Sequence, residues 1–162
     1  MKKTIHIYSV IMLPIVLLFT SCNVQRTALI GKYQDSSFHI ESAKTVDEVW
    51  SEVIDLLAAK GISIRIIEEP SGLIVSKESS LTFSTEVDGH LINPNAFVVV
   101  NSLDKEKYLY ITGEWNIRVK KAGEKTAVIA TLMEIKCYNT AIPNIEIKST
   151  GVFEKLIADA VR

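Results

Sequence analysis

Residues 108–138 read YLYITGEWNIRVKKAGEKTAVIATLMEIKCY and alternate more regularly than any other part of the chain. The first half places one set of mainly apolar positions on a single face: Leu109, Ile111, Gly113, Trp115, Ile117 and Val119. A turn is predicted over residues 121–124, which include Gly123. The second half, Thr126–Tyr138, predicts a long return strand with these residues on one face: Ile129, Met133, Ile135 and Cys137. We therefore expect a central antiparallel hairpin, apolar on one face and polar on the other.

Two helices and several shorter strands are expected around this hairpin. The sequence Thr45–Glu48 is a capping box, apolar residues follow it at helical spacing, and Gly61 ends the pattern, so a helix is predicted over 46–60. A second helix is predicted over about 151–161, with an apolar stripe of Phe153, Leu156, Ile157 and Ala160. Strands are predicted near 38–40, in a hairpin over 62–78, and over 96–100 after a loop at 88–95.

This order of elements predicts an α+β fold with a single antiparallel sheet and two helices packed on one face, an architecture that resembles helix-grip folds. The length of 162 residues suits one domain. The 18 basic and 19 acidic residues exclude a broad basic footprint for nucleic acid. An apolar content of 48% excludes intrinsic disorder.

The N-terminus has the composition of a secretory signal. Lys2 and Lys3 precede an apolar run that is strongest over residues 10–19, and residues 1–21 contain no acid. That run is shorter than the roughly 20 apolar residues that a membrane-spanning helix needs. We predict a signal peptide over residues 1–21, and the alternative is an uncleaved N-terminal anchor.

The segment Leu18-Phe19-Thr20-Ser21-Cys22 resembles the lipobox of bacterial lipoproteins, although Phe19 stands where that family usually has an aliphatic residue. The resemblance implies cleavage between Ser21 and Cys22 and acylation of the Cys22 thiol. Because no Asp follows Cys22, it also implies a location on the periplasmic side of the outer membrane. The remaining 141 residues carry 16 basic and 19 acidic side chains. We expect residues 22–36 to be the lipidated N-terminus and tether, and residues 37–162 to form one domain.

A second resemblance covers roughly residues 38–160. The passage from Val49-Trp50 through Gly61 to Gly72-Leu73-Ile74-Val75 is similar to domains of the lipoprotein BamC of the outer-membrane β-barrel assembly complex. It is also similar to TBP-like-fold lipoproteins of the Bacteroidota. The resemblance implies a helix-over-sheet domain that makes contacts and has no known chemistry.

Few residues suggest catalysis or metal binding. His39 and His90 have no acidic or cysteine partner at ligand spacing, and we expect both to be surface residues. Cys137 has no paired cysteine once Cys22 is acylated, and a core thiol is favoured over a reactive one. The sequence Ser149-Thr150-Gly151 fits helix capping better than anion binding. We predict no catalytic site, metal or cofactor.

The polar face of the central hairpin is the predicted contact surface. One strand contributes Tyr108, Tyr110 and Arg118 to this surface. The other contributes Leu132, Tyr138, Val128 and Ala130, and Arg65 extends the surface. Tyrosine and arginine are enriched in binding hot spots, although strand propensity also favours tyrosine and valine. Trp50 and Trp115 are predicted core residues.

The sequence therefore predicts a non-catalytic interaction module that binds a protein of the cell envelope. The alternative is a ligand-binding lipoprotein with a cavity between the sheet and the C-terminal helix. Gly113 and the loop over residues 84–95 would give that cavity room. An enzyme is the third choice, because no nucleophile or acid–base group was found.

Overall fold

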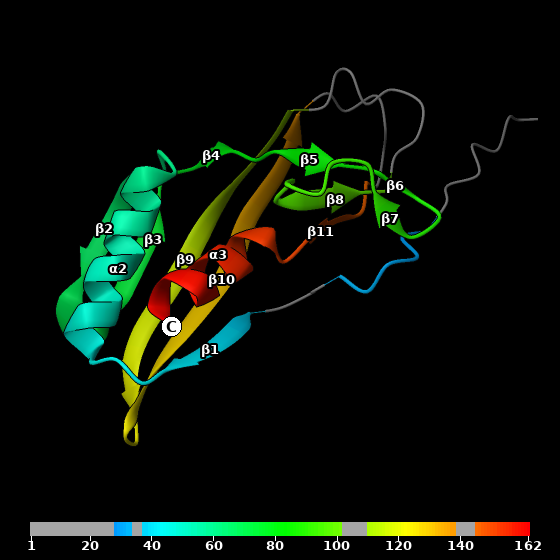
Figure 1. Cartoon of the computed structure of the whole chain (residues 1–162). Coiled ribbons are helices and arrows are strands. Elements are labelled where there is room, and N and C mark those ends of the chain that lie inside the picture. Colours follow the sequence, from blue (N-terminus) through cyan, green and yellow to red (C-terminus); the bar gives the residue numbers. More distant parts are fainter. Residues whose placement is uncertain (1–27, 34–36, 102–109, 139–144) are drawn as a thin grey trace, which may run out of the picture.

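The computed structural model describes residues 28–33, 37–101, 110–138 and 145–162 (Figure 1). The predicted signal peptide with Ser21, Cys22 and the tether residues 23–27 and 34–36 lie outside these residues, as do Tyr108 and Leu109. In the described part, no helix is long and apolar enough to cross a membrane.

The central hairpin consists of β9 (Tyr110–Ala122) and β10 (Lys125–Tyr138), joined by a turn at Gly123 and Glu124. It lies inside a six-stranded sheet with the order β1–β10–β9–β3–β2, and β4 also pairs with β9. All of these pairs are antiparallel. The other members are β1 (Phe38–Ser42), β2 (Ile64–Glu68), β3 (Leu73–Ser76) and β4 (Ser79–Ser80), and a short 3-10 helix, η1 (Glu69–Ser71), joins β2 to β3.

Two smaller sheets lie beyond β4. One has the order β11–β8–β5 and contains β5 (Phe83–Ser84), β8 (Val98–Val100) and β11 (Ile147–Ser149); β5 and β8 are parallel. The other is a two-stranded hairpin of β6 (Glu86–Val87) and β7 (His90–Leu91). The prediction of a single, wholly antiparallel sheet is therefore wrong, because the chain leaves the large sheet after β4 and pairs again around β8. The α+β class, the two helices and the mostly antiparallel pairing are confirmed.

The first helix, α2 (Val46–Ala59), begins with the predicted capping box. The Glu48 N–H donates to Thr45 Oγ1 at 3.3 Å, and the Thr45 N–H donates to Glu48 Oε2 at 2.8 Å. Gly61 then has a φ of +68°, a conformation that glycine adopts without strain. The second helix, α3 (Val152–Val161), follows Gly151. Both helix predictions are confirmed to within one residue at each end.

Both helices pack against the same side of the large sheet and form what we call the helix-backed core. Trp115 on β9 is fully buried, and its ring lies 4.1 Å from that of Phe153 on α3, measured between centroids. Trp50 is also buried, so both tryptophans are core residues as predicted. The other members include Val49, Val53, Leu57, Ile74, Ile117, Val119, Val128, Ala130, Ile157 and Val161.

A second, smaller core lies where the long hairpin meets β8. Its buried members are Leu81, Val98, Val100 and Ile111. Ile135 and Cys137 pack against it from β10, and Cys137 is half-buried. Burial raises the pKa of the Cys137 thiol, so its thiolate is disfavoured. The thiol is thus placed at a core, as expected.

A bulge in β10 separates the two cores. Leu132 lies opposite Trp115, whereas Cys137 lies opposite Ile111, so β10 carries one more residue than β9 between these pairs. Glu134 has a φ of +51° inside this bulge. One extra residue exchanges the two faces of a strand, because side chains alternate with a period of two.

The bulge overturns part of the predicted face of β10. Before it, Val128 and Ala130 are buried in the helix-backed core, and Leu132 packs against both cores. Ile129 and Met133 therefore lie on the other face, and only Ile135 and Cys137 belong to the buried face that the sequence predicted. The predicted face requires an unbroken alternation along the whole strand, which the bulge interrupts.

Candidate interaction surface

The face of the large sheet that points away from α2 and α3 is the outer face. On β9 it holds the residues that alternate with those of the two cores, namely Tyr110, Thr112, Glu114, Asn116 and Arg118, and of these Thr112 is buried. Figure 1 shows both helices on one side of the sheet. Among the described residues, no helix covers the outer face.

Two tyrosines occupy one end of the outer face. Tyr110 and Tyr138 are opposite each other on β9 and β10, and their ring centroids are 5.8 Å apart. They are 53% and 46% exposed. Cross-strand aromatic pairs contribute to sheet stability, but half of each ring here remains available to a partner.

Glu78, on the connection between β3 and β4, organises the polar groups beside these rings. Its carboxylate accepts hydrogen bonds from Lys136 Nζ at 2.7 Å, Thr112 Oγ1 at 2.6 Å and the Tyr138 hydroxyl at 3.2 Å. Lys136 above all, with help from the two hydroxyls, lowers the pKa of the Glu78 carboxyl to about 2. The carboxylate thus holds the Tyr138 hydroxyl in place.

Two arginines lie farther along the same face. Arg65 forms an ion pair with Glu114 at 2.5 Å. Arg118 is exposed between Leu73 on β3 and Ile129 on β10, and no ion pair within the described ranges includes it. Arg118 follows Tyr110 by eight positions, which corresponds to roughly 27 Å along the strand. The outer face is therefore a long strip with a tyrosine end and an arginine end.

The structure brings four of the six predicted contact residues to the outer face: Tyr110, Tyr138, Arg118 and Arg65. Leu132 was wrongly predicted, because the bulge turns it toward the cores. Tyr108 lies outside the described residues. Glu78 and the exposed Met133 and Ile66 were not among the predicted contact residues. The sequence does contain a signal for the bulge. The alternating apolar residues of β10 have even numbers up to Leu132 and odd numbers from Ile135 onward.

The remaining candidate residues, two histidines and the residues before α3, do not form a catalytic or metal site within the described part of the chain. His39 and His90 are exposed, and the described residues contain no group of three metal-ligating side chains. The Ser149 and Thr150 hydroxyls accept hydrogen bonds from the N–H groups of Gly151 and Val152, but the N-cap of α3 is Gly151 and no side chain caps the helix, so the predicted side-chain capping is not seen. The Ser149 hydroxyl also donates to the buried Glu154 carboxylate at 2.6 Å.

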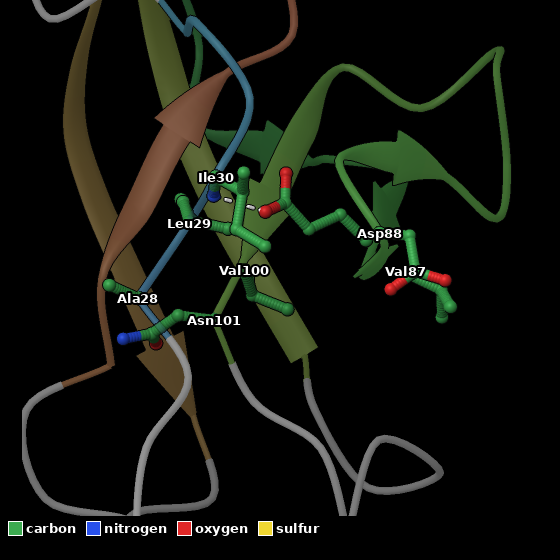
Figure 2. A pocket seen from close by; sticks show the side chains of 8 residues that line it. Ala28, Leu29, Ile30, Val87, Asp88, Val100 and Asn101 are labelled. Atoms are coloured by element: carbon green, nitrogen blue, oxygen red, sulfur yellow. Dashed lines mark hydrogen bonds between the residues drawn. The ribbon is translucent and has the colours of Figure 1, made fainter.

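The space between the sheet and α3 is filled where Trp115 meets Phe153. Gly113 does not open a cavity either, because a Cβ atom there would lie 2.9 Å from Leu81 Cδ1. Figure 2 shows a pocket elsewhere, of about 200 Å3, where residues 28–30 approach the β6–β7 hairpin. This volume is below the 300–1,000 Å3 that is usual for small-molecule sites. The pocket is lined by Ala28, Leu29, Ile30, Glu86, Val87, Asp88, Val100 and Asn101.

Comparisons with known proteins add little. No family model matches the chain, and no curated protein matches it. Among solved structures, the crystal structure of Ara h 8.0201 is similar over 77% of this chain and 93% of that chain, with 12% identity and a TM-score of 0.30. A TM-score this low supports no conclusion about fold or function.

Proposed function

We propose that this chain is a bacterial lipoprotein, anchored through acylated Cys22 on the periplasmic side of the outer membrane, and that its domain is a non-catalytic module for binding an envelope protein. The outer face of the large sheet is its contact surface. The helix-over-sheet architecture implied by BamC-like and TBP-like lipoproteins belongs to the same proposal.

The main support for the proposed contact surface is the contrast between the two faces of the large sheet. Both helices pack on one face, whereas the other presents half-exposed tyrosine rings, an exposed arginine and the exposed Met133. Tyrosine, arginine and methionine are enriched in protein interfaces. The support for the anchor comes from the sequence alone: the basic start, the short apolar run and the Ser21-Cys22 junction.

The anchor is tested by labelling cells with a palmitate analogue. We expect the label on the natural chain and its loss in the Cys22→Ala variant, with globomycin causing the unprocessed precursor to accumulate. An unlabelled natural chain that stays in the soluble periplasmic fraction would contradict the anchor.

The contact surface is tested by the native size of the lipoprotein after gentle extraction from outer membranes. We expect a complex larger than the monomer, and a shift toward the monomer in a variant that combines Tyr110→Ala with Arg118→Glu. The control is Lys155→Glu, which makes the same charge change at an exposed residue of α3. A monomer in all three proteins, or equal complexes in all three, would refute the surface.

A further inference from the structure

Residues 28–33, which we call the N-terminal strap, are attached to the β6–β7 hairpin by one carboxylate. Glu86 on β6 accepts hydrogen bonds from the N–H groups of Ile30 and Gly31 and from the Tyr33 hydroxyl. Burial alone would raise the pKa of the Glu86 carboxyl, but the hydrogen bonds outweigh it and hold the pKa below its usual value. The strap thus has a defined attachment point, and the dashed line at Ile30 in Figure 2 marks one of these bonds.

The strap, the hairpin and Ile92, which follows β7, together form what we call the hairpin end, and they carry the most exposed apolar side chains of the described residues. Ile30 is 67% exposed, Ile92 is 63% exposed and Val87 is 55% exposed, and no other large hydrophobic residue exceeds these values. A Cβ atom built on Gly89, in the hairpin turn, would lie 3.9 Å from Ile30 Cγ2. Strap and turn are therefore in contact, and three apolar side chains are exposed to solvent around them.

The length of chain before the strap limits how far this end can be from a lipid on Cys22. Ala28 is six positions after Cys22 in the sequence, which corresponds to at most about 20 Å of extended chain. If the strap were free, the flexible length would run to β1 at Phe38 and span more than twice that distance. Attachment to Glu86 therefore keeps the hairpin end close to the bilayer.

We propose that the hairpin end rests on the membrane surface and inserts Ile30, Val87 and Ile92 at the boundary between headgroups and acyl chains. This inference rests on the proposed lipid anchor. Because the anchor makes the contact intramolecular, three side chains that would bind a bilayer weakly on their own are sufficient.

The charges around the hairpin end indicate an apolar contact. Asp88 in the turn and Lys32 in the strap are both exposed and opposite in charge, so the described residues of this end form no basic patch to attract anionic lipid. Figure 1 shows the β9–β10 turn at the opposite end of the long strands from β6–β7. In this orientation the arginine end of the outer face stands away from the membrane, whereas Tyr110 and Tyr138 lie at the end of the strands that is nearer to it.

The test uses the full mature lipoprotein in vesicles of phosphatidylethanolamine and phosphatidylglycerol. In a Cys137→Ser background, single cysteines for a spin label are introduced as Val87→Cys, Ile92→Cys and, as a control in the β9–β10 turn, Glu124→Cys. We expect the ratio of oxygen to nickel-chelate accessibility to be several-fold higher at positions 87 and 92 than at position 124. Omitting phosphatidylglycerol should not change that ratio.

Flotation of the same vesicles separates the two possible failures. A protein that floats with the vesicles while all three labels are equally accessible to the nickel chelate would refute the membrane-resting surface and leave the anchor standing. A protein that does not float would refute the anchor and the surface with it.

A Glu86→Gln variant tests the strap itself. It removes the acceptor charge, so we expect the labels at positions 87 and 92 to become at least twofold more accessible to the nickel chelate. Unchanged accessibility would show that the attachment to Glu86 does not hold this end at the bilayer.

Discussion

The two faces of the β9–β10 hairpin are built from the same strands and differ in what covers them. The inner face is completely buried against α2 and α3 over the length of the helix-backed core. The outer face has polar side chains that pair with each other and apolar side chains that stay partly exposed. Helix packing therefore determines which residues stabilise the fold, whereas the uncovered face is free to carry residues for binding.

The largest expected effect is on the inner face. We expect Trp115→Ala to lower the free energy of unfolding by about 3–5 kcal/mol, because the ring is fully buried against Phe153. The matched outer-face variant, Tyr110→Ala, should lower the free energy of unfolding by about 0.5–1.5 kcal/mol, because it removes only the ring contact with Tyr138. Urea unfolding followed by circular dichroism measures both. Similar losses would mean that the two faces contribute equally to stability.

The next effect is at the bulge, where the two cores meet. Gly113→Ala should destabilise the protein by about 1–3 kcal/mol, because the new methyl group would lie 2.9 Å from Leu81 Cδ1 and 3.1 Å from Leu132 Cδ1. Gly123→Ala is an informative comparison, since nothing lies within 4 Å of its Cβ position and only its positive φ opposes the change. The urea midpoint of Gly113→Ala should therefore fall, and an unchanged midpoint would contradict the close packing opposite the bulge.

A substitution at Glu134 is expected to increase the stability of the protein by a smaller amount. Its φ of +51° is strained for a residue with a Cβ atom. Glycine relieves this strain and loses some entropy on folding, so Glu134→Gly should stabilise the protein by about 0.5–1 kcal/mol. The neighbouring Met133→Gly, in an ordinary strand position, should destabilise it. A stability loss in both variants would argue against the bulge.

The smallest effect is the pH dependence of the outer face. The pKa of Glu78 is lowered to about 2, so the stability that it contributes is complete above its ordinary value of 4.5 and disappears as the pH falls from 4.5 toward 2. Thermal unfolding between pH 2 and pH 5 should show a shallower pH dependence for Glu78→Gln. The variant Glu124→Gln, in the exposed turn, controls for the loss of one carboxylate. If stability depended on pH equally in both variants, the hydrogen bonds of Glu78 would not be the cause of the pH dependence.

Much of the fold follows from the sequence because its signals are local. The capping box at Thr45, the positive-φ glycines at Gly61 and Gly72, and the alternation along β9 each specify a conformation within a few residues. The small sheet around β8 does not follow, because its strands have two or three residues and pair over long separations in the sequence.

The candidate surface was predictable only where the alternation is unbroken. Tyr110 and Arg118 lie on β9, which has no bulge, and both were placed on the correct face. Leu132 was misplaced because its strand carries an extra residue at 134. Glu78 and Glu86 could not be found from the sequence, since each acts through partners more than 30 positions away.

The most direct test of the central claim is photo-crosslinking in intact cells, with benzoylphenylalanine placed at one position at a time in the natural lipoprotein. Positions 110 and 118 probe the outer face, and positions 55 and 155 probe exposed residues of α2 and α3. We predict one discrete adduct of the same mass from both outer-face positions and none from the two helix positions. Adducts from the helices alone, or no adduct from positions 110 and 118, would contradict the assignment of the outer face as the contact surface.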